Sequence, residues 1–346
     1  MYYLNRGASR TPRATGAAVS PAPDGSGGRP AEARGACASW GAPSPVGTLA
    51  RMPPRPFGAL LTAMASPMRE DGSLDVAGAA SLATYLMDSG HDGVVVSGTT
   101  GEAPTTSDEE KVALLQAVVE AVGARGHVLA GVGTNDTAHS SHLARMAAAA
   151  GADGLLLVAP YYSRPSQGGM VAHVRTVADA TELPVMLYDI PARSAVAFDT
   201  ETLLRLGEHP RVVAVKDAKG DLQAATRVMA GSDLAFYSGD DGMTLPLLAV
   251  GGAGVVGVTT HLLGPLFARL ITAVDAGDLA TAVAAHRDAQ PLVDAVMTRM
   301  PGVVSVKAAL RLLGRVRSDA VRLPLLRADG EQVVDLRAAL AAAALL

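Results

Sequence analysis

The sequence predicts an α/β fold, a (β/α)8 barrel of the TIM-barrel type followed by a helical C-terminal appendage. From about residue 57, short β-branched or apolar segments alternate with longer segments of helical period, the pattern of repeated βα units on a parallel sheet. Eight such units of about 25 residues each favour a closed barrel over an open doubly wound sheet. After the eighth unit's strand, residues 262–346 contain more helix than one unit needs.

The eight predicted strands are short apolar segments bounded by Gly, Pro, Asp or Ser. Near-continuous apolar runs are expected where both faces of a parallel strand are buried. In chain order, the predicted strands are residues 58–64, 92–97, 128–133, 154–159, 184–189, 212–217, 234–238 and 254–259.

Each predicted strand is followed by a helical segment, and several helices carry their own start and stop signals. Residues 106–110, Thr-Ser-Asp-Glu-Glu, precede an apolar-periodic run to residue 122, and residues 199–201, Asp-Thr-Glu, precede another. Gly123, Gly151 and Gly207 lie where helices are expected to end.

The chain of 346 residues divides by composition into three parts. Residues 1–55 are rich in Ala, Gly, Pro, Ser and Arg and are predicted to be a disordered extension, although a targeting segment is the alternative. Met52 directly precedes the first folded element and is an alternative start of the protein. The catalytic barrel is predicted over residues 56–276 and the helical C-terminal region over 277–346.

Composition and charge exclude several classes of function. A net charge of −4 provides no basic surface for nucleic acid or an anionic membrane, and no apolar run has the length of a membrane span. The one cysteine, Cys37, excludes a disulfide framework and indicates a cytoplasmic protein. No group of His, Cys or carboxylates has metal-ligand spacing, since His139 and His142 lack companions, and no glycine-rich loop fits a dinucleotide or P-loop motif. The sequence therefore predicts no metal, no nucleic acid and no membrane.

Lys216 is the first candidate catalytic residue. It interrupts the apolar run of residues 212–215, and lysine is rarely buried without a specific reason. Burial lowers the pKa of an ammonium group and leaves a neutral amine able to attack a carbonyl carbon. The alternative is a lysine that extends to the surface or pairs with a carboxylate.

Other polar side chains follow neighbouring strands, at the barrel end where functional residues gather. Tyr188 is expected at the depth of Lys216 on the adjacent strand, where a phenol could exchange protons with a substrate. The turn at residues 98–101, Gly-Thr-Thr-Gly, offers hydroxyls and backbone N–H groups to a carboxylate, and Arg193 could bind a second carboxylate. Individually, Tyr188 could be a wall residue and Arg193 a solvated surface residue.

Five motifs together resemble the dihydrodipicolinate synthase family, one of the pyruvate-dependent lyases that also include N-acetylneuraminate lyase. The resemblance runs from about residue 57 to the C-terminal helices. The motifs are Gly98-Thr99-Thr100-Gly101-Glu102, Pro160-Tyr161-Tyr162, Leu187-Tyr188 with Pro191 and Arg193, Val215-Lys216-Asp217, and Ser238-Gly239-Asp240-Asp241.

The resemblance implies a reaction and a role for each residue. Lys216 forms an imine with pyruvate, which becomes an enamine and attacks aspartate semialdehyde, in the diaminopimelate route to lysine and without a cofactor. The implied proton relay is Thr99, Tyr188 and Tyr162, with Tyr162 reaching into a neighbouring subunit of a homotetramer, a dimer of dimers. Further implied contacts are Thr100 and Gly101 for the pyruvate carboxylate, Arg193 for the semialdehyde carboxylate, and the backbone of Gly239 and Val256 lining the pyruvate site.

The sequence also departs from the family pattern. Asp189 replaces the commoner asparagine and is expected to face away from the pocket. In the lysine feedback site, Asp108, Lys111 and His139 replace the His, His and Glu of many inhibited members, whereas Asn135 and Tyr161 are kept. A cation at Lys111 would repel the amino groups of lysine, so the sequence predicts weak or absent feedback inhibition.

Two alternative functions remain open at this point. A retro-aldolase for 2-keto-3-deoxygluconate or N-acetylneuraminate would use the same lysine and tyrosine. Arg193 and the Thr99-Thr100 pair favour the synthase, because the neuraminate lyases usually carry Ser-Thr and lack this arginine. An inactive family member acting as a binding or regulatory protein is disfavoured by the complete set of site residues.

Overall fold

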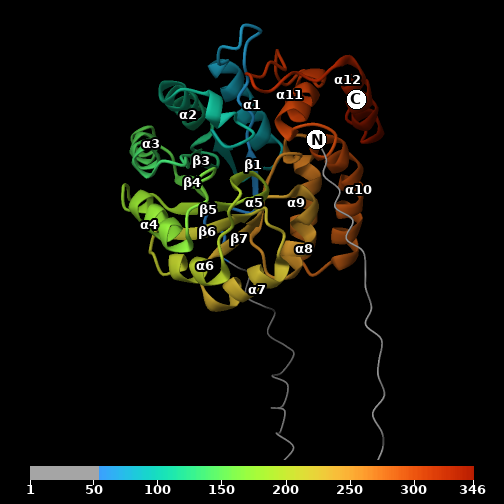
Figure 1. The fold of residues 1–346 in the computed structure, drawn as a ribbon. Helices are drawn as coiled ribbons and strands as arrows, with labels where there is room; N and C mark the ends of the chain where they lie inside the picture. The colour runs from blue at the N-terminus through green and yellow to red at the C-terminus, as the bar shows by residue number, and fades with distance from the viewer. Residues whose placement is uncertain (1–53) are drawn as a thin grey trace, which may run out of the picture. The chain divides into compact units, whose positions relative to one another are not determined.

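Residues 54–346 are described by the structure, a computed structural model, and their centre is a closed barrel of parallel strands (Figure 1). The strand order is β1-β2-β3-β4-β5-β6-β7-β8, and β8 closes the barrel on β1. The strands are β1 (Leu60–Ala63), β2 (Gly93–Val96), β3 (His127–Gly131), β4 (Gly154–Val158), β5 (Val185–Asp189), β6 (Val212–Asp217), β7 (Ala235–Ser238) and β8 (Gly254–Gly257). The predicted fold class is therefore confirmed.

All eight predicted strands are present, but several end earlier than predicted. Ser97 has a φ of 56° and so leaves the extended conformation directly after β2. Thr259 lies at the N-cap of the next helix rather than at the end of β8. Polar residues at these positions begin the loops that carry the site. The apolar sequence pattern does not show where a strand ends and such a loop begins.

The helices alternate with the strands around the outside of the barrel (Figure 1). Ser107 and Glu110 form a reciprocal capping box at the start of the second helix, as their spacing predicts. Gly123 follows that helix and Gly151, with a φ of 89°, follows the third, whereas Gly207 is the last residue of its helix. The helices are α1 (Val76–Asp88), α2 (Asp108–Val122), α3 (Thr137–Ala149), α4 (Gln167–Ala178), α5 (Pro191–Ser194), α6 (Thr200–Gly207), α7 (Leu222–Gly231), α8 (Thr244–Ala249) and α9 (Thr260–Asp275), with the 3-10 turns η1 (Ala103–Thr105) and η2 (Asp241–Met243).

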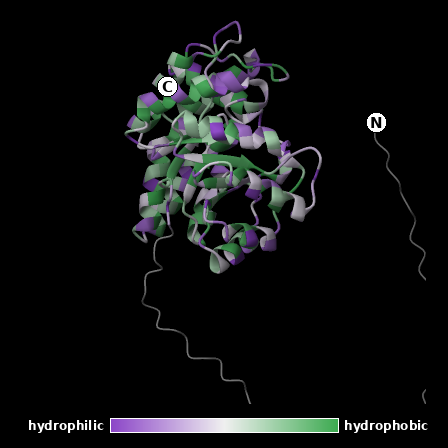
Figure 2. Ribbon diagram, turned by 90° about the vertical axis from the view of Figure 1, so that its left-hand side faces the viewer, coloured by the Kyte–Doolittle hydropathy of each residue, from purple (hydrophilic) through white to green (hydrophobic). Residues whose placement is uncertain are grey.

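Apolar residues form two separate layers, one inside the barrel and one between the strands and the helices. Successive side chains of a strand point to opposite faces, so each strand contributes to both layers. In Figure 2 the strands are coloured mainly as hydrophobic, whereas the surrounding helices mix hydrophobic and hydrophilic residues. On β5, Met186 and Tyr188 belong to the inner layer, and on β6, Ala214 does. Lys216 is two residues after Ala214, so it lies on the same inner face of β6.

Three further helices follow the barrel, α10 (Leu279–Met297), α11 (Gly302–Leu312) and α12 (Gly330–Ala342). α10 packs along α9 and also contacts α12, and α11 contacts both α9 and α12 (Figure 1). Within residues 54–346, no helix has the length and apolar character needed to cross a membrane. Residues 1–53 of the predicted extension, which include Cys37, lie outside the described residues. Arg55 is described, and it donates to the Ala253 carbonyl and to Asp275.

Candidate functional site

Lys216 and Tyr188 lie side by side at the C-terminal ends of β6 and β5. The two residues are direct partners in the strand register, as their positions in the sequence predict. The Nζ atom of Lys216 lies 4.3 Å from the centroid of the Tyr188 ring. Both side chains are almost fully buried, with exposed fractions of 4% for Lys216 and 5% for Tyr188. The amine and the phenol can therefore act on the same small substrate.

Burial shifts the pKa values of these two groups in opposite directions. It lowers the pKa of Lys216 to about 8, against an opposing effect of the Asp241 carboxylate. It raises the pKa of Tyr188 to about 12, and the charge of Arg193 and contact with the Thr99 side chain oppose that rise. Lys216 is thus a more available nucleophile at neutral pH than a solvated lysine, and Tyr188 remains a protonated phenol.

Asp241 is a buried carboxylate near this pair whose role the sequence did not indicate. Its Oδ1 accepts hydrogen bonds from the backbone of Val258 and Thr259 and, at 2.6 Å, from the Thr259 hydroxyl. These bonds fasten the end of β7 to the loop after β8, and burial raises the pKa of Asp241. The Asp240-Asp241 sequence directly after a strand was the available signal, but spacing alone does not distinguish a solvated carboxylate from a buried one.

Gly239 lies beside Lys216, and Val256 lies inside the barrel. A Cβ atom on Gly239 would lie 3.0 Å from Cγ of Lys216, so a larger residue would crowd the lysine stem. Val256 pairs with Leu61 of β1 and belongs to the inner apolar layer. Their positions suit the predicted role of lining a site around Lys216.

The turn after β2 brings Thr99 and Thr100 to the same end of the barrel. Thr100 is buried and Thr99 is exposed. Gly101 is tightly enclosed, because a Cβ atom there would lie 3.1 Å from the backbone of Ser97. The turn is bracketed by two non-glycine residues in the left-handed region, Ser97 and Glu102.

A cavity of about 450 Å³ opens next to Tyr188. Tyr188 lines this cavity and Lys216 does not. The cavity therefore adjoins the Lys216–Tyr188 pair on the side of the tyrosine. The predicted catalytic and substrate-binding residues in the lining are Thr99, Tyr188 and Arg193. The predicted regulatory residues in the lining are Asp108, Lys111, Asn135, His139 and Tyr161. One cavity thus joins two groups of residues that the sequence treated separately.

The regulatory group is organised around Asp108. The His139 Nε2 atom lies 2.9 Å from Asp108 Oδ2, and Lys111 Nζ lies 3.9 Å from Asp108 Oδ1. Lys111 Nζ also donates to the Thr106 carbonyl, and burial lowers the pKa of Lys111. A basic side chain therefore takes up part of this end of the cavity.

Tyr162 and Arg193 are both exposed predicted site residues. Tyr162 has an exposed fraction of 87% and a φ of 74°, and it is not among the residues that line the cavity beside Tyr188. Arg193 lies on the one-turn helix α5 and is exposed while lining the cavity. Arg193 is placed to contact a molecule bound in the cavity, whereas the Tyr162 side chain is directed to the surface.

Asp189 faces away from the cavity, as predicted. Its Oδ1 accepts a hydrogen bond from the Phe198 backbone at 3.3 Å, and its Oδ2 lies 3.3 Å from Lys219 Nζ. Burial raises the pKa of Asp189 to about 6. An aspartate is accommodated here because Lys219 supplies the opposite charge.

Known proteins match nearly the whole described chain. The model of the "Dihydrodipicolinate synthetase family" matches residues 56–343. The 4-hydroxy-tetrahydrodipicolinate synthases of Kineococcus radiotolerans and Acidothermus cellulolyticus are each 57% identical, over 87% and 84% of this chain and 97% and 94% of their own lengths. A crystal structure of the Cyanidioschyzon merolae enzyme with lysine bound is 40% identical with a TM-score of 0.82, over 85% of this chain and 100% of that one. The chain belongs to the dihydrodipicolinate synthetase family.

Proposed function

We propose that this protein is a lyase that condenses pyruvate with L-aspartate 4-semialdehyde to 4-hydroxy-tetrahydrodipicolinate, in the diaminopimelate route to lysine. The observation that carries the proposal is the buried pair of Lys216 and Tyr188 beside a cavity that Arg193 also lines. The high identity to synthases over nearly all of their length supports the same substrates.

The reaction begins with attack of the neutral Lys216 amine on C2 of pyruvate. The resulting carbinolamine loses water to give an imine, and loss of a proton from C3 gives an enamine. C3 of the enamine then bonds to the aldehyde carbon of the semialdehyde, whose oxygen takes up a proton. The amino group of the condensed chain attacks C2, closes the ring and releases Lys216 as a free amine.

The site residues divide these tasks among them. Tyr188 is the proton donor and acceptor, and Thr99 and Tyr162 complete its relay. Thr100 and Gly101 hold the pyruvate carboxylate, and Gly239 and Val256 line the pyruvate site with their backbone. Arg193 binds the semialdehyde carboxylate through its planar pair of N–H donors. These assignments give the carboxylate of each substrate its own partner.

The chemistry requires no cofactor in this proposal. The protonated imine withdraws electrons from C3, which is the task that a metal or an organic cofactor performs in other enzymes. Among residues 54–346, no three His, Cys, Asp or Glu side chains are grouped as metal ligands. We propose that the enzyme works in the cytoplasm on small molecules, without nucleic acid or membrane.

Exposure of Tyr162 supports association with a second subunit, and we propose a homotetramer that is a dimer of dimers. A tyrosine that is 87% exposed next to a catalytic cavity can reach the site of a second subunit. Sedimentation velocity at micromolar concentration tests this, and a fully active monomer would contradict it.

The pH dependence of the first step follows from the pKa of Lys216. Since only the neutral amine attacks pyruvate, a pKa lowered from 10.5 to about 8 predicts that kcat/KM for pyruvate rises through about pH 8. Below that pH it should fall by roughly tenfold per unit. The profile is measured with the semialdehyde saturating, and a midpoint near 10 would show that Lys216 is not perturbed.

Feedback inhibition by lysine is expected to be weak or absent. Lys111 places a cation in the cavity, next to Asp108 and His139, where the amino groups of lysine would have to bind. Activity is measured over 0 to about 10 mM lysine, a range that spans ordinary metabolite affinities. Half-inhibition at submillimolar lysine would contradict the expectation.

Turnover on three substrates tests the function itself. Pyruvate with aspartate semialdehyde is followed by coupling to dihydrodipicolinate reductase, and cleavage of N-acetylneuraminate and of 2-keto-3-deoxygluconate is measured in parallel. The proposal expects turnover of the semialdehyde alone. Cleavage of a sugar acid would support the retro-aldolase, and inactivity on all three substrates would support a binding or regulatory protein.

A further inference from the structure

A fully buried ion pair joins the substrate turn after β2 to the C-terminal helices. Nζ of Lys307, on α11, lies 2.6 Å from Oε1 of Glu102, and each side chain has an exposed fraction of 1%. Glu102 directly follows Thr99, Thr100 and Gly101, whereas Lys307 is 205 residues further along the chain. The mechanism proposed above assigns no role to either residue.

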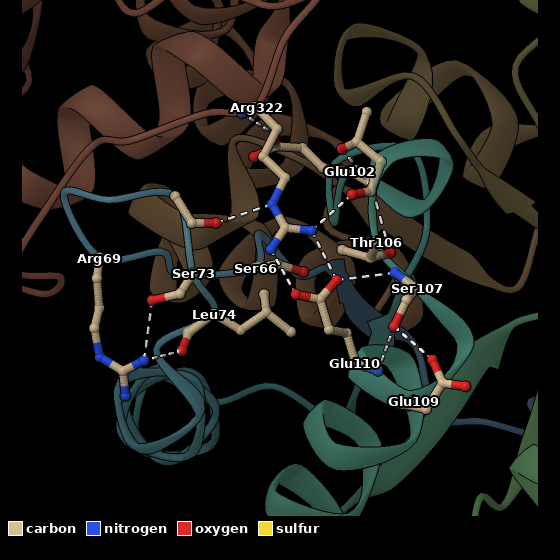
Figure 3. Close-up of polar contacts among 12 residues, drawn as sticks. Ser66, Arg69, Ser73, Leu74, Glu102, Thr106, Ser107, Glu109, Glu110 and Arg322 are labelled. Carbon is tan, nitrogen blue, oxygen red and sulfur yellow. Dashed lines mark hydrogen bonds and ion pairs between the residues drawn. The ribbon is translucent and has the colours of Figure 1, made fainter.

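The second oxygen of Glu102 is held by the same C-terminal region. Oε2 accepts a hydrogen bond from the backbone N–H of Arg322 at 2.9 Å. The Arg322 guanidinium donates in turn to the Thr105 carbonyl and to both oxygens of Glu110, at the start of α2 (Figure 3). Both carboxylate oxygens of Glu102 are thus fixed from outside the barrel.

The backbone of the turn adopts a conformation that its own residues do not favour. Ser97 has a φ of 56° and Glu102 a φ of 54°, the left-handed region that residues other than glycine rarely adopt. Between them, the Gly101 carbonyl accepts a hydrogen bond from Ser66 Oγ at 2.8 Å. Such a conformation persists when surrounding contacts impose it. Besides the turn's own backbone hydrogen bonds, the contacts from other elements here are Ser66, Lys307 and Arg322.

Stability alone is a weak explanation for this pair. Removing two charges from water offsets most of their attraction, so a well-packed apolar pair would serve the fold as well. A charged pair instead fixes the position of the carboxylate, because Glu102 must remain within hydrogen-bonding distance of Lys307. The Glu102 carboxylate held in this way is three residues after Thr99 and two after Thr100.

We propose that Glu102 and Lys307 are positioning residues for pyruvate, which hold the Thr99-Thr100-Gly101 turn in the geometry that receives the pyruvate carboxylate. The inference rests on the proposed function. It predicts a selective defect, because Arg193 is on α5 and has no contact with this pair. Pyruvate binding and imine formation should suffer, whereas the affinity for the semialdehyde should not.

The test is the double variant Glu102→Gln/Lys307→Met. It removes both charges together, so neither position is left with an unpaired buried ion, and the amide oxygen of the new glutamine can still accept the Arg322 hydrogen bond. We expect kcat/KM for pyruvate to fall roughly 10- to 100-fold, the effect of a small misplacement of a binding group, and the KM for the semialdehyde to stay within about twofold. Imine formation, measured by borohydride trapping and intact mass, should slow by the same factor as kcat/KM for pyruvate.

Arg311→Met is the matched control. Arg311 is also on α11 and pairs with Asp319 at 3.1 Å, but it does not contact the turn. This variant should keep the wild-type constants for both substrates. An Arg311→Met variant with the same pyruvate defect would show that any disturbance of α11 acts on the site, and would overturn a specific role for the pair.

Each other outcome also decides the inference. A folded double variant with wild-type kcat/KM for pyruvate would overturn it, as would an equal loss for both substrates. A double variant that does not fold would assign the pair to stability alone and would overturn it too. Wild-type protein is measured in the same assay, and its failure to turn over pyruvate and the semialdehyde would instead reject the proposed function.

Discussion

Replacing Lys216 with alanine should lower the rate of condensation by roughly 10⁴-fold or more and abolish the adduct that borohydride traps with pyruvate. The expected loss is large because alanine offers no amine, and no other described side chain is placed to substitute for it. Lys219 is the nearest lysine in sequence, but it is engaged with Asp189 and with the Phe198 carbonyl.

Lys219→Arg is the matched control for this prediction. It keeps the positive charge beside Asp189 while removing an amine three residues from Lys216. The mass of the pyruvate adduct should appear in wild type and in Lys219→Arg, and tandem mass spectrometry should locate it on Lys216. An adduct on another lysine, or full activity of Lys216→Ala, would reject the proposed mechanism.

The barrel and the central pair could be predicted because their signals are local. The eight strands are marked by apolar segments at regular intervals, and Lys216 by the interruption of one of them. Tyr188 and Lys216 are at equal depth because side chains alternate between the two faces of adjacent parallel strands in the same way. The strand register confirms this.

Contacts between distant segments could not be predicted in the same way. The partner of Glu102 lies on α11, and one sequence contains no signal that relates Lys307 to a turn in the second βα unit. Lys307 carries the same local signal as Lys216, a lysine within an apolar run. Lys307 pairs with a carboxylate, whereas no carboxylate in residues 54–346 forms an ion pair with Lys216. The sequence signal identifies a buried lysine, and only the neighbours decide its chemistry.

An apolar sequence pattern also does not predict where the strands end. Ser97 leaves the extended conformation because the turn after β2 requires a positive φ, and the chain around Thr259 becomes a helix N-cap. Each of these residues is polar and adjoins the site. The boundaries were therefore least predictable where the loops depart from regular structure to carry function.

Replacing Tyr188 with phenylalanine should lower kcat by roughly 10²- to 10⁴-fold, the usual contribution of a positioned proton donor. Phenylalanine keeps the ring beside Lys216 Nζ and removes only the hydroxyl, so the site should keep its shape. Because burial raises the pKa of Tyr188 to about 12, the wild-type phenol remains protonated throughout the neutral range and can donate to the carbinolamine oxygen as water leaves. The measurements are kcat and the single-turnover rate of imine formation.

Tyr237→Phe is the matched control for the loss of a buried phenol. Tyr237 lies on β7 in register with Lys216, but its hydroxyl donates to the Gly58 carbonyl at 2.9 Å, ahead of β1 and away from the site. The hydroxyl also accepts a hydrogen bond from the Phe57 backbone N–H at 3.4 Å. This variant should lose about 1 to 3 kcal/mol of stability from the two bonds and keep its kcat. If Tyr188→Phe formed the imine at the wild-type rate and lost activity only in the later steps, Tyr188 would serve the condensation rather than the dehydration. If it kept the wild-type kcat, proton transfer would have to be assigned to another group, and Thr99, which lines the same cavity, would be the first to examine.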